Sequence, residues 1–232
     1  MRSTIQQHFE ALFLIDSHGD LLYINAPVEP KKCPAPLVYY GIAADEVIFA
    51  VRADVPTRDR LRLQDIAKND ASPKGCRALL TAARTVLEEH FVVGTDYSGP
   101  TFEFPEDLGA ESDCVVVDAS NCAVLSGGFD DIIPEIRAVQ PCVASLVGGR
   151  AAAVCQTVRQ TPHAVEAGVL TLEAFRRQGH GCRAVRAWAA CVRDEGCKPL
   201  YSTWWENEAS RGLAASLQMR QYGVDAHVSQ AI

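Results

Sequence analysis

The sequence lacks the long apolar runs and the regularly spaced cysteines that mark several common classes of protein. None of its apolar runs approaches the length of a transmembrane helix, and the short run at residues 11–15 is too short and poorly flanked for a signal peptide. The nine cysteines form no Cys-x-x-Cys pair, and neither they nor the six histidines show a metal-ligand spacing. We therefore expect a soluble cytoplasmic protein with reduced cysteines and no metal.

Clusters of basic residues are missing as well. With 22 basic and 29 acidic residues, the formal net charge is −7. Nucleic acids and anionic membranes attract concentrated Lys and Arg, so neither is an expected partner. An acidic protein is compatible with a positively charged amine as its substrate. The chain of 232 residues, 48% of them hydrophobic, is long enough for one large domain or two small ones.

The first 98 residues predict a smaller α+β domain without a recognisable chemical motif. His8, His18 and His90 are isolated, which is typical of surface or hydrogen-bonded histidines. Gly99-Pro100 is a strong breaker, so we expect a loop at 95–105 and a domain boundary between residues 98 and 99. The expected elements are a hairpin around 17–20, strands at 37–42 and 46–52, and helices at 58–69 and 74–90.

Residues 99–232 predict a second domain in which strands precede helices. Gly148-Gly149 lies between two apolar runs and is the strongest hairpin signal of the chain. Apolar residues at 185, 188, 189 and 192 fall on one face of a helix. The expected strands are 114–118, 142–147, 150–159, 165–172, 200–205 and 226–229, and the expected helices are 129–139, 182–195 and one that begins at Asn207.

The turn between the strand at 165–172 and the helix at 182–195 carries the clearest chemistry. It reads Arg-Arg-Gln-Gly-His-Gly at 176–181. Glycines let the backbone approach an anion closely, and the free N–H groups at a helix N-terminus bind one. The two arginines add positive charge. The turn therefore predicts a phosphate or pyrophosphate site, although a Gly-x-Gly before a helix is also found as a simple tight turn.

Together these features resemble the GNAT superfamily of N-acetyltransferases. The family signature Arg/Gln-x-x-Gly-x-Gly/Ala matches 176–181, and the family's Asn after the fifth strand, with Ala or Ser three residues later, matches Asn207 and Ser210. The resemblance covers about the last 120 residues, most strongly 165–223. It implies a mixed, mostly antiparallel sheet flanked by helices, with the smaller α+β domain before it; we expect that domain to cover the catalytic half and help select the acceptor.

The same resemblance implies that acetyl-CoA is the cosubstrate and that its acetyl group passes to a primary amine of an unidentified small molecule or peptide. The pyrophosphate would bind at the turn and the pantetheine arm along the fourth strand. The sequence leaves open whether the chain forms a homodimer. The implied cofactor-binding residues are Leu170, Thr171, Leu172, Arg176, Arg177, Gln178, Gly179, His180, Gly181, Cys182, Asn207 and Ser210.

A dinucleotide fingerprint is the rival interpretation, because residues 179–184 also fit G-x-G-x-x-G/A. In that motif the first glycine directly follows its strand, whereas here residues 173–178 intervene. The fold would also need further βα units after the motif, and only about 50 residues remain. Glu206 stands near the position of a ribose-binding carboxylate, but it is a single match among several required.

Three residues are candidates for proton transfer. Glu166 lies on the fourth strand, where several family members carry their general base, and His163 is a weaker alternative because Pro162 places it in a turn. The family often has a catalytic Tyr seven residues after the Asn, but here that position is Ala214. Tyr222, which we expect near the end of a longer helix, is the candidate acid; otherwise solvent protonates the thiolate. The missing Tyr favours, as an alternative function, a CoA-binding regulatory module without turnover.

Overall fold

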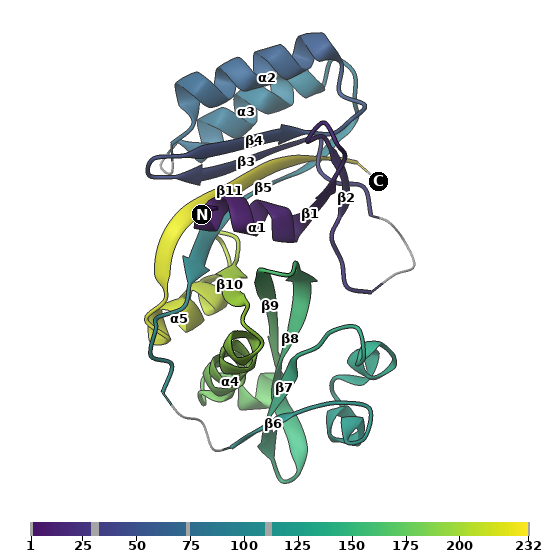
Figure 1. Cartoon of the computed structure of the whole chain (residues 1–232), viewed down its shortest axis with the longest axis vertical. Coiled ribbons are helices and arrows are strands. Elements are labelled where there is room, and N and C mark those ends of the chain that lie inside the picture. Colours follow the sequence, from purple (N-terminus) through teal and green to yellow (C-terminus); the bar gives the residue numbers. More distant parts are fainter. Residues whose placement is uncertain (1, 29–32, 73–74, 110–112, 232) are drawn as a thin grey trace.

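A single large sheet runs through both halves of the chain. The computed structural model describes residues 2–28, 33–72, 75–109 and 113–231. Within these residues nine strands follow the order β4-β3-β11-β5-β10-β9-β8-β7-β6 (Figure 1). Their bounds are β3 (Val38–Ala43), β4 (Val47–Val51), β5 (Val93–Glu103), β6 (Cys114–Val116), β7 (Cys142–Val147), β8 (Arg150–Gln160), β9 (Ala164–Thr171), β10 (Lys198–Ser202) and β11 (Arg220–Gln230). Among the described strands of this sheet only β9 and β10 pair in parallel, so the predicted mixed, mostly antiparallel sheet is confirmed.

The helices of the first half lie on opposite faces of this sheet. Along β3 the side chain of Tyr40 packs in the cluster that includes α2 (Thr57–Asp70) and α3 (Cys76–Leu87). Its neighbour Tyr39 packs instead against Phe9 of α1 (Thr4–Leu12), as strand alternation requires. Figure 1 shows α2 and α3 on one side of β3 and β4, and α1 on the other. The hairpin of β1 (Phe13–Ile15) and β2 (Leu21–Ile24) follows α1.

In the second half, α4 (His180–Asp194) packs on the sheet through the predicted apolar face, which includes the fully buried Trp188. The opposite face is covered by two short 3-10 helices, η1 (Cys122–Leu125) and η2 (Asp130–Glu135). A continuous helix at 129–139 was therefore wrong. Pro134 lies inside η2, and a proline has no N–H with which to continue a longer helix.

The loop predicted at 95–105 is also wrong, because β5 occupies most of it. Gly99 is required there for close approach: a Cβ atom at this position would lie 1.8 Å from the carbonyl oxygen of Thr203. Pro100 lacks an N–H but its carbonyl accepts a hydrogen bond from Thr203. The Gly99-Pro100 pair, which predicted a loop, therefore marks a place where β5 packs closely against Thr203. The predicted domain boundary between residues 98 and 99 falls inside β5, and the residues on both sides of it pair with β11.

The C-terminal helix is shorter than expected, and this changes the position of Tyr222. Helix α5 (Glu208–Ser216) ends two residues before Gln218, which adopts a positive φ of 54°. Strand β11 then begins at Arg220, six residues before the predicted strand. Tyr222 therefore lies on β11 and not near a helix end. Residues 220–222 read Arg-Gln-Tyr without alternating apolar positions, which conceals the start of the strand; its apolar members begin at Val224.

Other predictions hold. The nine cysteines, all within the described residues, form no disulfide with one another. The meander β7-β8-β9 is present, with the turn at Gly148-Gly149. The helix predicted at 74–90 spans Cys76–Leu87, and Lys74 lies outside the described residues. In the described part of the chain, every helix is too short or too polar to cross a bilayer.

Candidate active site

The neighbouring strands β9 and β10 separate at Glu166. Their parallel pairing extends only over Ala164–Glu166 of β9, whereas β9 continues to Thr171 and stays paired with β8 on its other edge. Beyond Glu166, β10 pairs with β5 on its other side. No described strand therefore pairs with this edge of β9 from residue 167 to 171. Leu170, on this segment, is 56% exposed.

The predicted turn connects β9 to the N-terminus of α4. Arg177 and Gly179 adopt positive φ values of 60° and 83°, and Gly179 precedes the first residue of α4 without a side-chain cap. The first helical hydrogen bond runs from the N–H of Arg183 to the carbonyl of Gly179 at 3.0 Å. The N–H groups of His180 and Gly181 come before it and have no acceptor within the helix. Residues 176–179 are exposed, as an anion-binding turn requires.

Gly181 and His180 have structural reasons for their positions. A Cβ atom on Gly181 would lie 2.9 Å from the Thr171 hydroxyl, so glycine lets the start of α4 approach β9. The His180 side chain turns inward, where its Nδ1 lies 2.9 Å from Ser145 Oγ and 2.8 Å from an Arg183 nitrogen. Burial and Arg183 lower the pKa of His180. Its imidazole is therefore neutral near pH 7, and only its backbone faces the turn.

The Asn207 side chain acts as the N-cap of α5. Its Oδ1 accepts a hydrogen bond from the Ser210 N–H at 3.0 Å, and the Ser210 hydroxyl is hydrogen-bonded to Tyr201. Both residues were predicted to bind a cofactor. In this structure their polar atoms are used to start the helix and fix it to β10.

Replacing Asn207 with Ala should lower the free energy of unfolding by about 1 kcal/mol, the usual contribution of an N-cap. Chemical denaturation of the two proteins measures this difference. Gln221→Ala, an exposed change on β11, serves as the control for mutation in the same region. A loss no larger than that of the control would show that the cap does not stabilise α5.

Glu166 projects from the face of β9 opposite to α4 and is only 5% exposed. The hydroxyl of Ser202, from β10, donates a hydrogen bond to its Oε1. His8, from α1, places its Nε2 3.4 Å from the same oxygen. Burial raises the pKa of Glu166, but the hydrogen bond and positive charge of His8 outweigh it, and the pKa is lowered overall. The carboxylate is thus ionised near neutral pH.

His8 connects Glu166 with Asp225 and Tyr222 of β11. Its Nε2 lies 3.4 Å from Asp225 Oδ2, and its Nδ1 is hydrogen-bonded to the hydroxyl of Tyr222. Tyr39 donates a hydrogen bond to the other oxygen of Asp225. Burial raises the pKa of Tyr222 well above its ordinary value. We call His8, Tyr39, Glu166, Ser202, Tyr222 and Asp225 the buried polar cluster.

A bulge explains how Tyr222 and Asp225 reach the same cluster. Strict alternation would place residues 222 and 225 on opposite faces of β11, but the register with β5 shifts between Gln221 and Gly223. The extra residue is Tyr222, which turns toward α1. A second shift, between Thr157 and Arg159 of β8, lies opposite Glu166. Gly168 accommodates it, since a Cβ there would lie 2.3 Å from Val158.

The two predicted catalytic residues therefore meet through a histidine that the sequence did not single out. His8 is entirely buried and belongs to a part of the chain without a motif. Asp225 offered a signal, because it is a lone charge between the apolar residues Val224 and Ala226. His163, the alternative base, is exposed in the turn before β9.

Two other places in the described structure bring polar side chains together or form a hollow. Asp59, Glu89 and His90 have ligand atoms within 4.8 Å of one another, a grouping that the sequence did not suggest. Arg62 already lies 3.3 Å from Asp59 and 2.7 Å from Glu89, so its guanidinium group supplies the positive charge in this cluster.

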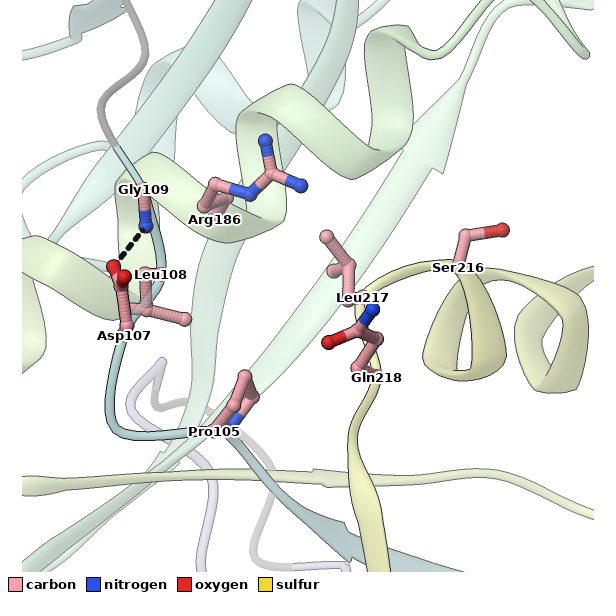
Figure 2. A pocket seen from close by; sticks show the side chains of 8 residues that line it. All are labelled: Pro105, Asp107, Leu108, Gly109, Arg186, Ser216, Leu217 and Gln218. Atoms are coloured by element: carbon pink, nitrogen blue, oxygen red, sulfur yellow. Dashed lines mark hydrogen bonds between the residues drawn. The ribbon is translucent and has the colours of Figure 1, made fainter.

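A hollow of about 270 Å³ lies between the loop after β5, α4 and the end of α5 (Figure 2). None of its lining residues is a predicted site residue; they are Pro105, Asp107, Leu108, Gly109, Arg186, Ser216, Leu217 and Gln218.

Comparison with solved structures identifies the fold. No protein-family model matches the sequence, and no curated protein does. A GCN5-related N-acetyltransferase-like protein from Streptococcus suis matches with a TM-score of 0.51 and 16% identity over 85% of each chain. A GCN5-related N-acetyltransferase from Kribbella flavida gives a TM-score of 0.48 and 14% identity over 98% of this chain and 94% of that one. A GNAT-family protein described as an acetyltransferase, from Novosphingobium aromaticivorans, gives a TM-score of 0.46 and 18% identity. That match covers 60% of this chain and 67% of the other.

The Streptococcus suis likeness covers both halves of the chain and establishes the GNAT fold. The structure contains two features that the sequence predicted, the meander of β7, β8 and β9 and a glycine turn between β9 and α4. It adds the parallel pairing of β9 with β10.

Proposed function

We propose that this protein, which has the GNAT fold, is an N-acetyltransferase that transfers an acetyl group from acetyl-CoA to a primary amine. One observation carries the proposal. The free edge of β9 leads from the carboxylate of Glu166 to the open N-terminus of α4. Acetyl-CoA is a linear cosubstrate with a thioester at one end, amide groups along its arm and a pyrophosphate further along. In the same order, the protein offers Glu166, the free edge of β9 and the N-terminus of α4.

The residues present fit acetyl-CoA. The N–H groups at the start of α4, together with Arg176 and Arg177, suit the pyrophosphate. The unpaired backbone groups of β9 at residues 168–171 suit the amides of the pantetheine arm. Asn207 and Ser210, which cap α5, would contribute through the position of that helix. When bound, the cosubstrate supplies the activated acetyl group.

The reaction needs a route for one proton. The neutral amine attacks the thioester carbon, the C–N bond forms, and the C–S bond breaks as CoA leaves as a thiolate. The amine loses a proton, which we assign to Glu166, directly or through the hydroxyl of Ser202. The thiolate takes up a proton from solvent or from Tyr222. With His8 protonated, its Nδ1–H donates to the Tyr222 oxygen, which leaves the phenol proton available for transfer.

The acceptor is proposed to be a small molecule or a peptide that carries a primary amine. The net charge of −7 favours a cation over a polyanion. We do not expect nucleic acid or membranes as partners, and we propose that the protein works in the cytoplasm without a metal.

One observation favours a second function, that of a CoA-binding module without turnover. Glu166 is nearly buried beneath α1, and the Tyr222 hydroxyl is engaged by His8. In such a module, both groups would stabilise the fold instead of exchanging protons. Thiol release from acetyl-CoA, measured with polyamines, amino acids, aminoglycosides and peptide N-termini, separates the two functions.

Binding of CoA tests the shared part of both functions. We expect wild-type protein to bind CoA in a calorimeter, and Gly179→Val to lose that binding, because a β-branched residue resists the positive φ of 83° that shapes the turn. Gly196→Val is the matched control, since Gly196 has a similar φ of 78° at the far end of α4. A protein that takes up NAD but not CoA would overturn the proposal in favour of the dinucleotide interpretation.

A further inference from the structure

We propose that His8, on the N-terminal helix α1, is a positioning residue for acyl transfer, which keeps Glu166 ionised and oriented toward the acceptor. This inference deepens the proposed function and rests on it. It also gives the first half of the chain, which the sequence resemblance does not cover, a direct part in the reaction.

The geometry singles out His8. It is fully buried, and it is held at both ring nitrogens: Nδ1 by the Tyr222 hydroxyl, and Nε2 at 3.4 Å from each of two carboxylates. Nε2 has no closer, well-aligned hydrogen-bond partner among the described residues. An imidazolium shared between Glu166 and Asp225 explains why these groups converge in a buried place.

The position of Glu166 at the end of the parallel pairing makes its charge relevant to catalysis. Its carboxylate stands where β9 and β10 separate, and Ser202, which bonds to it, is the last residue of β10. Without a positive partner, burial would favour the neutral carboxylic acid, which cannot take a proton from an amine. His8 opposes that tendency from α1, where it contacts both Glu166 of β9 and Asp225 of β11.

The titratable groups around His8 together set whether His8 and Glu166 are charged. Glu166 comes from β9, Asp225 and Tyr222 from β11, and Tyr39 from β3. Burial lowers the pKa of His8, but Asp225 and Glu166 outweigh it and raise the pKa to about 9. Arg159, on β8, adds a weaker favourable charge at Glu166. His8 is therefore a cation at neutral pH.

The first measurement is the pH dependence of thiol release by wild-type protein and His8→Gln, with acetyl-CoA and an accepted amine. We expect the acid limb of the profile to move to higher pH in the variant, because Glu166 loses the charge that lowers its pKa. A merely structural role would reduce the rate at every pH without moving the limb. His18→Gln removes an exposed histidine from the turn between β1 and β2 and should leave the profile unchanged. An unmoved limb in His8→Gln overturns the inference.

The second measurement needs no activity and no folded His8 variant. The ¹⁵N resonances of the imidazoles in wild-type protein should show His8 protonated until about pH 9. In Glu166→Gln, the same histidine should lose its proton at lower pH. A wild-type His8 that titrates near 6.5, or is unaffected by Glu166→Gln, overturns its role even if thiol is released. If His8 and Glu166 titrate together but no amine leads to thiol release, the proposed function is overturned. The catalytic role of His8 and Glu166 falls with it.

Discussion

Glu166→Gln should lower the turnover of acetyl transfer by roughly 10²–10⁴-fold, the usual contribution of a general base. The change is nearly isosteric, and the amide oxygen can still accept the hydrogen bond from Ser202. What disappears is the basic carboxylate at the point where β9 and β10 separate. The affinity for CoA should hardly change, because the proposed pyrophosphate site at 176–182 lies at the other end of the free edge of β9. Steady-state thiol release and calorimetry measure the two quantities.

Glu135→Gln is the control for this experiment, since Glu135 is exposed at the end of η2. Circular dichroism of both variants establishes that they are folded. If affinity for CoA fell as much as turnover, Glu166 would support the strand and not the reaction. A wild-type rate in Glu166→Gln would assign the proton to ordered water, or would mean that the amine arrives already neutral.

The free energy of unfolding should fall by about 3 kcal/mol as the pH rises from 6.5 to 9, owing to His8. Its pKa is higher in the folded protein, at about 9, than the ordinary value of 6.5. The folded state therefore holds this proton more tightly, and the stabilisation is complete below pH 6.5 and lost as the pH passes 9. Glu166, whose pKa is lowered, stays ionised across this window and does not add to the slope.

Urea denaturation at several pH values measures this effect. The difference between wild-type protein and His8→Gln isolates the histidine, because the buried thiols and tyrosines titrate in both proteins. We expect the variant to be less stable at pH 6.5 and the two curves to converge near pH 9. Parallel curves would contradict a charged His8, and its contacts with Glu166 and Asp225 would then be those of a neutral imidazole.

The sequence predicted the second half of the fold well, because its signals are local. Gly148-Gly149 specifies a hairpin, and the spacing of Val185 to Val192 specifies one face of a helix. The glycine turn is likewise defined by neighbouring residues. These features need little information from the rest of the chain.

The errors occurred where long-range contacts decide the structure. Gly99 and Pro100 resemble a loop because their strand is crowded by Thr203, which is far away in the sequence. The start of β11 is polar, since Arg220 pairs with Glu103 at 2.7 Å. Charged residues that bond across a sheet give no period-two apolar pattern, so the helix before them was extended too far.

The candidate site was predicted in part for the same reason. Glu166 could be selected from its strand, and Gly179 from its turn. His8 could not, because nothing near it in the sequence indicates that it will lie 3.4 Å from residues 166 and 225. Tyr222 was selected, but its orientation depends on a bulge that sequence alternation does not reveal.

The position of β5 has a consequence for how the protein is made. Strand β5 belongs to the first half, yet it lies between β10 and β11, and β11 in turn joins it to β3. During translation, β3 and β5 of the first half cannot be joined into one sheet before residues 220–230 have left the ribosome, because β11 lies between them. Until then Tyr39 and His8 have no Asp225 or Tyr222 to meet. We therefore expect protection by chaperones to matter most for nascent chains that end before β11, and a fragment of 99–232 to remain aggregation-prone.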